Sequence, residues 1–247
     1  MSNIEHGQVA FGTSTIDYRV ERSTRRKTVT VAIDPVDGVI LKAPVDVPEQ
    51  RLDAVVTSKG AWILQRLLDY RELGPAPPPR EYVGGESYLY LGRSYRLKVV
   101  SSADVREPRA ALRGAFLTVE ISEDDADEGR ADVVRDALVS WYRRRAARRL
   151  PERVALYAAR AGLECPPVLI RNQEKRWGSC SSKGEVRFNW RIIMGPMSLV
   201  DYVVAHEVCH LQVRDHSSAF WRLLGAVLPD YEERRTRLRV EGLWYRV

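Results

Sequence analysis

The segment His206-Glu207-Val208-Cys209-His210 constrains this chain more than any other part of its 247-residue sequence. An apolar stretch, residues 199–205, precedes it, and this pattern predicts a buried helix. Residues four apart on an α-helix lie one turn above each other, so His206 and His210 project from the same face. Two imidazoles in this arrangement can bind one Zn²⁺, at about 2.0–2.1 Å per Zn–N bond. The sequence therefore predicts a zinc site on this helix.

A third histidine completes the predicted ligand set. The chain has only four histidines, and three of them, His206, His210 and His216, lie within eleven residues. We expect His216 to be presented from the first turn of a following helix that Asp215 or Ser217 caps. Because only three good protein ligands are visible, the fourth metal position is expected to stay open. An open position is typical of catalytic zinc, whereas structural zinc, the alternative, usually has four protein ligands.

Glu207 is predicted to act on water rather than to bind the metal. It follows the first ligand directly and so points in a neighbouring direction, towards a water held by the zinc. Zinc lowers the pKa of such a water towards ~7, and Glu207 can take its proton as the water attacks a carbonyl. Cys209 precedes His210, faces away from the metal and is interpreted as a small core residue.

An arginine-rich stretch supports a second interpretation. The formal net charge is +6, and five arginines gather between residues 143 and 149. A solvated helix face is the ordinary explanation of such a run. The alternative function is a nucleic-acid-associated protein in which the cluster Arg143 to Arg149 binds phosphates.

Composition predicts a cytoplasmic protein. The three cysteines are an odd number in a chain of this size, which argues against a disulfide framework and for a reducing compartment. The first residues lack the basic start and apolar core of a secretory signal. No run of eighteen apolar residues is present, so no membrane partner is expected.

The predicted fold class is α+β, with two regions. Residues 1–122 are expected to form a β-rich N-terminal region with strands at 16–20, 28–33, 39–42, 88–91, 95–100 and 116–121. A helical segment is expected at about 48–72, followed by a stiff proline-rich connector at 74–79. No internal repeat is evident in the residues.

Residues 123–247 are expected to form the catalytic domain. A helix begins near Ala131, and Pro151 is expected to kink or restart it. A strand is predicted at 168–171 and a hairpin at 177–181 and 186–190. The helix that carries the histidines is expected to begin at Ser198, with Asp201 completing an S-x-x-D capping box.

The residues around these elements form recognisable motifs. They are Arg176-Trp177-Gly178-Ser179-Cys180-Ser181, Phe188-Asn189-Trp190-Arg191, Asp201-Tyr202-Val203-Val204, Asp215-His216-Ser217, Phe220-Trp221 and Pro229-Asp230-Tyr231, with weaker matches at Arg25-Arg26-Lys27, Ala43-Pro44, Trp62-Ile63 and Tyr90-Leu91-Gly92. In these motifs the chain resembles the YgjP-like metallopeptidases, which are related to the SprT-like zinc proteases. Val213 stands where the longer metzincin motif has glycine, which separates the chain from that group.

The resemblance implies a gluzincin-like, zincin-type domain whose small antiparallel sheet packs on the helix of the HExxH motif. It implies a zinc metallopeptidase that hydrolyses peptide or protein substrates, with His206, His210 and His216 as ligands and Glu207 as general base. Most family members have asparagine where this chain has Asp215. SprT-like relatives that act on DNA-linked proteins make a combination of peptidase and DNA binding a further alternative.

Two expectations concern substrate contacts. The predicted edge strand at Gly178 can pair with an extended peptide, and the glycine would allow a close backbone approach. Arg176, Arg191 and Tyr231 are candidates for stabilising the negative charge of the intermediate.

Overall fold

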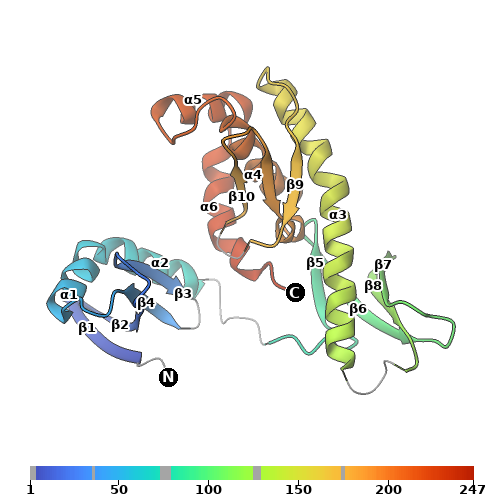
Figure 1. Cartoon of the computed structure of the whole chain (residues 1–247), viewed down its shortest axis with the longest axis horizontal. Coiled ribbons are helices and arrows are strands. Elements are labelled where there is room, and N and C mark those ends of the chain that lie inside the picture. The colour runs from blue at the N-terminus through green and yellow to red at the C-terminus, as the bar shows by residue number, and fades with distance from the viewer. Residues whose placement is uncertain (1–3, 35–36, 73–78, 125–128, 174–175) are drawn as a thin grey trace. The chain divides into compact units, whose positions relative to one another are not determined.

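The computed structural model describes residues 4–34, 37–72, 79–124, 129–173 and 176–247. The chain divides into two compact units, Met1–Pro78 and Pro79–Val247, which Figure 1 shows in one view. The proline-rich connector was predicted at residues 74–79, and residues 74–78 of it lie outside the described residues. The first unit ends well before residue 122, because the second β-rich segment shares a core with the helices that follow it. The functional division into residues 1–122 and 123–247 stays a prediction.

The first unit is a four-stranded sheet followed by two helices. Its elements are β1 (Ile4–Phe11), β2 (Ser14–Arg22), β3 (Thr30–Asp34), β4 (Gly38–Ala43), α1 (Glu49–Ser58) and α2 (Gly60–Glu72). The strand order is β1-β2-β4-β3, with β2 and β4 parallel and the outer pairs antiparallel. Alternate residues of β2, such as Ile16 and Val20, pack with Leu52 and Ile63 of the helices. The predicted strands and the helical segment of this part are confirmed, and β1 is an addition.

The second unit begins with another four-stranded sheet. Its strands are β5 (Ser87–Tyr90), β6 (Arg93–Ser101), β7 (Arg109–Arg113) and β8 (Phe116–Ile121), in the order β5-β6-β8-β7. Here too the two central strands are parallel and the outer pairs antiparallel. The two sheets therefore share strand order and pairing, a repeat of topology that the residue pattern does not reveal.

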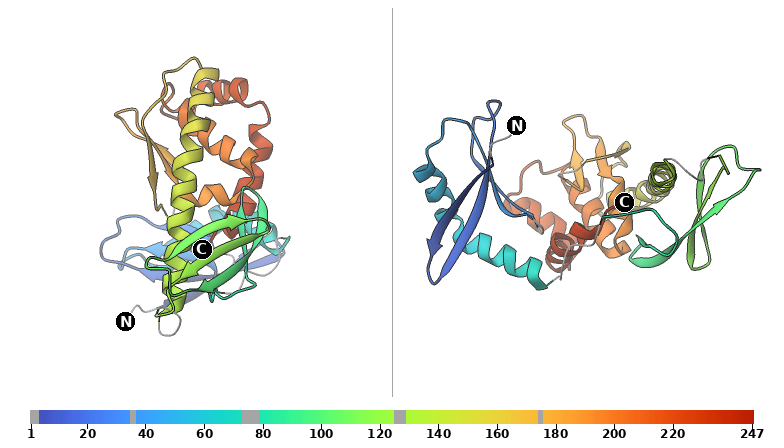
Figure 2. Two further views of the ribbon diagram at one scale, coloured as in Figure 1. Left: turned by 90° about the vertical axis from the view of Figure 1, so that its right-hand side faces the viewer. Right: turned by 90° about the horizontal axis from the view of Figure 1, so that it is seen from below.

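Helix α3 (Arg130–Arg160) is the central element of the second unit. In the right-hand view of Figure 2 it lies between strands β6–β8 and the elements that follow it in the chain. Of the kink or restart expected at Pro151, the restart is wrong, because α3 continues through this residue as one helix. Leu150 and Val154 are fully buried on either side of it. Packing of this face keeps the helix intact although proline cannot donate the backbone hydrogen bond.

The remaining elements form the part that carries the histidines. They are β9 (Val168–Arg171), β10 (Gly178–Cys180), β11 (Val186–Asn189), the 3₁₀ helix η1 (Trp190–Met194), α4 (Met197–Cys209), α5 (Ser218–Val227), α6 (Tyr231–Glu241) and the 3₁₀ helix η2 (Gly242–Trp244). The predicted hairpin is the antiparallel pair β10–β11, and β9 adds to it in parallel. Strand β10 forms the edge and packs on α4. The chain is thus an α+β protein, as the sequence predicts.

Helix α4 is almost entirely buried, as its apolar sequence predicts. It begins at Met197 after Pro196, and the expected capping box is wrong, since the Ser198 side chain makes no capping hydrogen bond. Asp201 is instead paired with Arg153 of α3. Among the described residues, no helix has the length and apolar character needed to cross a membrane.

Candidate metal centre

The structure brings the three clustered histidines to one point. The Nε2 atoms of His206 and His210 are 3.2 Å apart, those of His210 and His216 are 3.2 Å apart, and those of His216 and His206 are 3.0 Å apart. His206 lies on α4, His210 is the residue that ends α4, and His216 lies just before Ser217, the residue that precedes α5. Three nitrogen atoms that converge in this way form a group that could hold a metal ion.

The surroundings keep these imidazoles in the form that binds metals. Nδ1 of His210 lies 3.0 Å from the carbonyl oxygen of Val213, so this nitrogen carries the proton and Nε2 presents its lone pair. Burial and the neighbouring imidazoles lower the pKa of His206 to about 3. Burial also lowers the pKa of His210. Both rings are therefore neutral at physiological pH, as metal ligation requires.

Glu207 is buried beside this cluster, with its side chain against the backbone of the edge strand. A Cβ added to Gly178 would lie 2.6 Å from Cγ and 2.7 Å from Oε1 of Glu207. The glycine therefore creates the space that the carboxyl group occupies. Burial raises the pKa of the Glu207 carboxyl to about 8, and the charge of Arg176 opposes part of this rise. A cation held by the imidazoles would lower the pKa again, because an opposite charge favours the carboxylate.

Comparison with known proteins identifies the family of the chain. The family model of the YgjP-like metallopeptidase domain matches residues 27–241. The chain belongs to the YgjP-like metallopeptidase family. No curated protein matches it. Among solved structures it is similar to the metallopeptidase zymogen of Pyrococcus abyssi abylysin, with 23% identity over 36% of this chain and 90% of that chain and a TM-score of 0.34.

Aromatic side chains of α5 support two of the imidazoles in this YgjP-like chain. The ring of His210 stacks on Phe220 at a centroid distance of 4.4 Å, and that of His216 stacks on Trp221 at 5.5 Å. Phe220 is fully buried. Residues four and five places after His216 reach the rings because α5 begins directly after this histidine. The Phe220-Trp221 pair was visible in the sequence as a motif, but its contact with the histidines was not predicted.

The loop that presents His216 is held at both ends. Its first residues continue from α4 through the hydrogen bond from Val213 N to Cys209 O, 3.0 Å long. Arg214 then donates from Nη1 to the carbonyl oxygen of Ser181 in the β10–β11 hairpin, at 2.6 Å. Asp215 accepts a hydrogen bond from the backbone N–H of Ser217, whose own side chain makes no capping bond. His216 is thus presented from a loop that is tied to the hairpin rather than from a helical turn.

An ion pair fixes the active-site helix to α3. Arg153 donates from Nε to Oδ1 of Asp201 at 2.6 Å and from Nη2 to Oδ2 at 2.8 Å. The Asp201 residue is only 8% exposed, so the bidentate pair is formed at the edge of the core. It holds α4 one turn before His206.

A pocket of about 300 Å³ opens beside His206 and Glu207. It is bordered by α4, by α6 and by the chain that enters β10; its lining residues are Arg176, Trp177, Gly178, Tyr202, Val203, His206, Glu207, Arg235, Leu238 and Arg239. The three arginines make it strongly basic. Only the arginine at 176 had been considered from the sequence, because no local pattern shows that α6 packs on α4.

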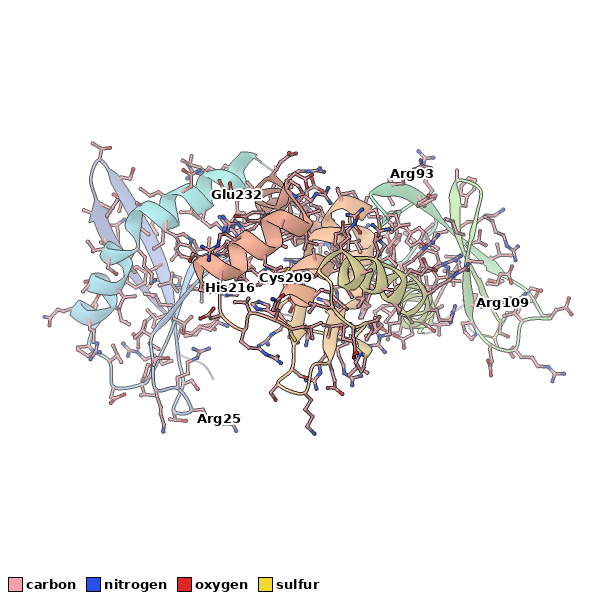
Figure 3. All side chains as sticks on the ribbon, turned by 90° about the horizontal axis from the view of Figure 1, so that it is seen from above. Arg25, Arg93, Arg109, Cys209, His216 and Glu232 are labelled. Carbon is pink, nitrogen blue, oxygen red and sulfur yellow. The ribbon has the colours of Figure 1, made fainter. Side chains whose placement is uncertain are left out.

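The other residues singled out from the sequence do not line this pocket. The guanidinium of Arg191 stacks on Trp190 and contacts Asn172. Tyr231 stacks on Trp221, and its hydroxyl lies 3.1 Å from Glu232. Cys209 is fully buried, which confirms its role as a core residue, and Figure 3 labels it together with His216. Of the three candidates for charge stabilisation, only Arg176 borders the pocket with Glu207.

Proposed function

We propose that this metallopeptidase is zinc-dependent, that His206, His210 and His216 hold the metal, and that Glu207 is the general base. The observation that carries the proposal is the convergence of three Nε2 atoms at mutual distances of 3.0–3.2 Å. A tetrahedral zinc ion with bonds of about 2.0–2.1 Å has ligand atoms about 3.3–3.4 Å apart, so the three imidazoles fit one zinc ion with small adjustments.

The donor set favours a catalytic rather than a structural zinc site. Within the part of the chain that the structure describes, the cluster contains three metal-binding side chains and no fourth. A site with three protein ligands leaves a position for water or substrate. Glu207 follows the proposed ligand His206 in the sequence and lines the pocket beside the three histidines.

Different residues of the chain have different roles in the proposed hydrolysis of a peptide. When bound, zinc supplies a Lewis acid that polarises a carbonyl and acidifies water. Glu207 accepts the proton of the attacking water and returns it to the leaving amine. The Gly178 backbone fixes the position of this carboxyl, and the stacked rings of Phe220 and Trp221 fix two imidazoles. An extended substrate can pair with β10, whose outer edge has no strand partner among the described residues.

The test compares zinc content and peptide hydrolysis in the full chain and in Glu207→Gln. We expect about one zinc per chain in both proteins and a loss of hydrolysis of roughly 10²–10⁴-fold in the variant. Glu164→Gln, which changes an exposed carboxylate, is the matched control and should cleave like the wild type. A wild-type protein purified without chelator that contains no zinc would contradict the proposal. Equal hydrolysis by Glu207→Gln would remove Glu207 as the base.

A second candidate function is nucleic-acid binding by the arginine cluster of α3. Arg143 and Arg144 line a hollow of about 490 Å³ together with Arg171 at the end of β9. Arg143 and Arg148 are exposed and form no ion pair within the described residues. Retention on DNA that falls with salt, and that is lost when Arg143, Arg144 and Arg148 become alanine, would support this function. Absence of retention at low salt would exclude it.

A further inference from the structure

The pocket beside Glu207 is lined by arginines of α6 that form no ion pair within the described residues. Helix α6 carries Arg234, Arg235, Arg237 and Arg239. Arg234 forms an ion pair with Asp230 at 2.8 Å, and Arg237 forms one with Glu241 at 2.9 Å. Arg235 and Arg239 line the pocket and have no carboxylate partner among the described residues. Helix α6 therefore has two arginines that are neutralised locally and two that are not.

Arg235 and Arg239 are four residues apart and so lie on one face of α6. The guanidinium of Arg235 is placed over the ring of Trp221, 5.0 Å from its centroid, and its Nε is buried with no hydrogen-bond partner among the described residues. A buried donor without a partner costs free energy unless a ligand or water satisfies it. Arg176, in the chain that leads into β10, also lines the pocket.

Apart from Gly178, His206 and Glu207, the rest of the lining consists of apolar and aromatic side chains. These are Trp177, Tyr202, Val203 and Leu238. Apolar walls lower the local dielectric constant and strengthen the attraction between a guanidinium and an anion. The volume of about 300 Å³ accommodates a single amino-acid side chain or the end of a peptide.

We propose that this pocket is a substrate subsite that binds a carboxylate next to the bond to be cleaved. Arg235 and Arg239, together with Arg176, are the specificity-determining residues, because guanidinium groups bind carboxylates through charge-assisted and often bidentate hydrogen bonds. The carboxylate is either an Asp or Glu side chain or the C-terminal carboxylate of a peptide. This inference rests on the proposed function, since the same pocket includes His206 and Glu207.

The first experiment maps cleavage sites. The full chain loaded with zinc digests an unfolded protein, and the new termini are identified by mass spectrometry. A peptide is then made around the most frequent site in four forms: Glu or Gln at the enriched position, each with a free or an amidated C-terminus. We expect the charged form at one of the two positions to raise kcat/KM by about tenfold or more, mainly through KM. The position that responds identifies the source of the carboxylate.

The second experiment assigns the effect to the arginines. Arg239→Gln and Arg235→Gln should each remove most of the preference for the charged peptide, measured as the ratio of kcat/KM for the charged and the neutral peptide. Arg237→Gln, which changes a paired arginine on the same helix, should keep the full preference. Thermal melts identify a variant that fails to fold. Arg239 is exposed, so its replacement is expected to leave the fold intact even if that of Arg235 does not.

A binding measurement separates this proposal from the proposed function. Fluorescence anisotropy is measured with Glu207→Gln protein, in which no turnover is expected, and with the arginine replacements added to it. The labelled peptides for this measurement have one fixed sequence with Glu or Gln and a free or amidated C-terminus, so that no cleavage site has to be known. Tighter binding of the charged peptide, lost in Glu207→Gln/Arg239→Gln, would support the subsite even if the wild type hydrolysed nothing. Equal binding and equal cleavage of charged and neutral peptides would overturn it. The proposal would also be overturned if a short single-stranded DNA displaced the charged peptide while the peptides with Glu and with Gln bound equally tightly.

Discussion

Replacement of Gly178 by alanine should disable Glu207 while leaving all three histidines in place. The added Cβ would lie 2.6 Å from Cγ of Glu207, whereas carbon atoms pack at about 3.5–4.0 Å. The carboxyl group or the edge strand must therefore move by the difference, about 0.9–1.4 Å. A displacement of about 1 Å can cost a catalytic group roughly a hundredfold in rate. We expect kcat to fall by about this factor, with an unchanged zinc content.

The assay is steady-state hydrolysis of a labelled peptide by the full chain, with zinc measured by mass spectrometry and the fold checked by a thermal melt. Overpacking of this kind costs about 1–3 kcal/mol, so the variant should melt somewhat earlier and still be folded at the assay temperature. Ser179→Ala, in the same strand, and Gly84→Ala, whose new Cβ would meet nothing nearer than 4.0 Å, are the controls. If Gly178→Ala hydrolysed peptide as fast as Ser179→Ala, the placement of Glu207 against this strand would be wrong.

Three further predictions concern stability and metal binding. Arg153→Ala leaves the carboxylate of Asp201 poorly solvated and without its ion-pair partner. It should therefore lower the free energy of unfolding, measured by urea titration, by about 2–3 kcal/mol. Arg149→Ala, which removes an exposed ion pair with Glu152, is the control and should lower it by less than about 1 kcal/mol. A chelator should lower the melting temperature of the wild type, because a metal that binds only the folded chain stabilises it by about 2.7 kcal/mol at a hundred times its dissociation constant. His216→Ala should bind zinc far more weakly in a competition titration with a chromogenic chelator, and its melting temperature should no longer respond to chelator; an unchanged affinity would remove His216 from the ligand set.

The part of the site that the sequence predicted is the part that local geometry determines. His206 and His210 share a face of α4 because the helix has 3.6 residues per turn, whatever packs around it. His216 was within reach because it follows His210 by only six positions. The manner of its presentation was predicted less well, since the Arg214 bond to the β10–β11 hairpin joins residues 33 apart.

The errors arose where a distant partner overrides a local pattern. Ser198 and Asp201 have the spacing of a capping box, but Asp201 pairs with Arg153, 48 residues earlier, and the box does not form. Pro151 should interrupt an isolated helix, yet α3 is held on both sides of it by the core. The pocket arginines Arg235 and Arg239 were not singled out from the sequence, because only the packing of α6 on α4 places them beside Glu207.

Strands β1 and β7 were not predicted, for a different reason. Strand β1 includes polar residues such as Glu5 and Gln8, so its apolar alternation is weak; its antiparallel pairing with β2 determines its conformation. Strand β7 is defined in the same way by its pairing with β8. The shared topology of the two sheets is likewise a property of backbone pairing, and it left no repeat in the side chains that could be recognised.

The most direct test of the metal centre is diffraction from crystals of the full chain, measured on both sides of the zinc absorption edge. We expect one anomalous peak per chain, enclosed by Nε2 of His206, His210 and His216 at about 2.0–2.1 Å. Absence of zinc from a protein purified without chelator, or a zinc ion whose ligands do not include these three nitrogens, would contradict the proposed centre.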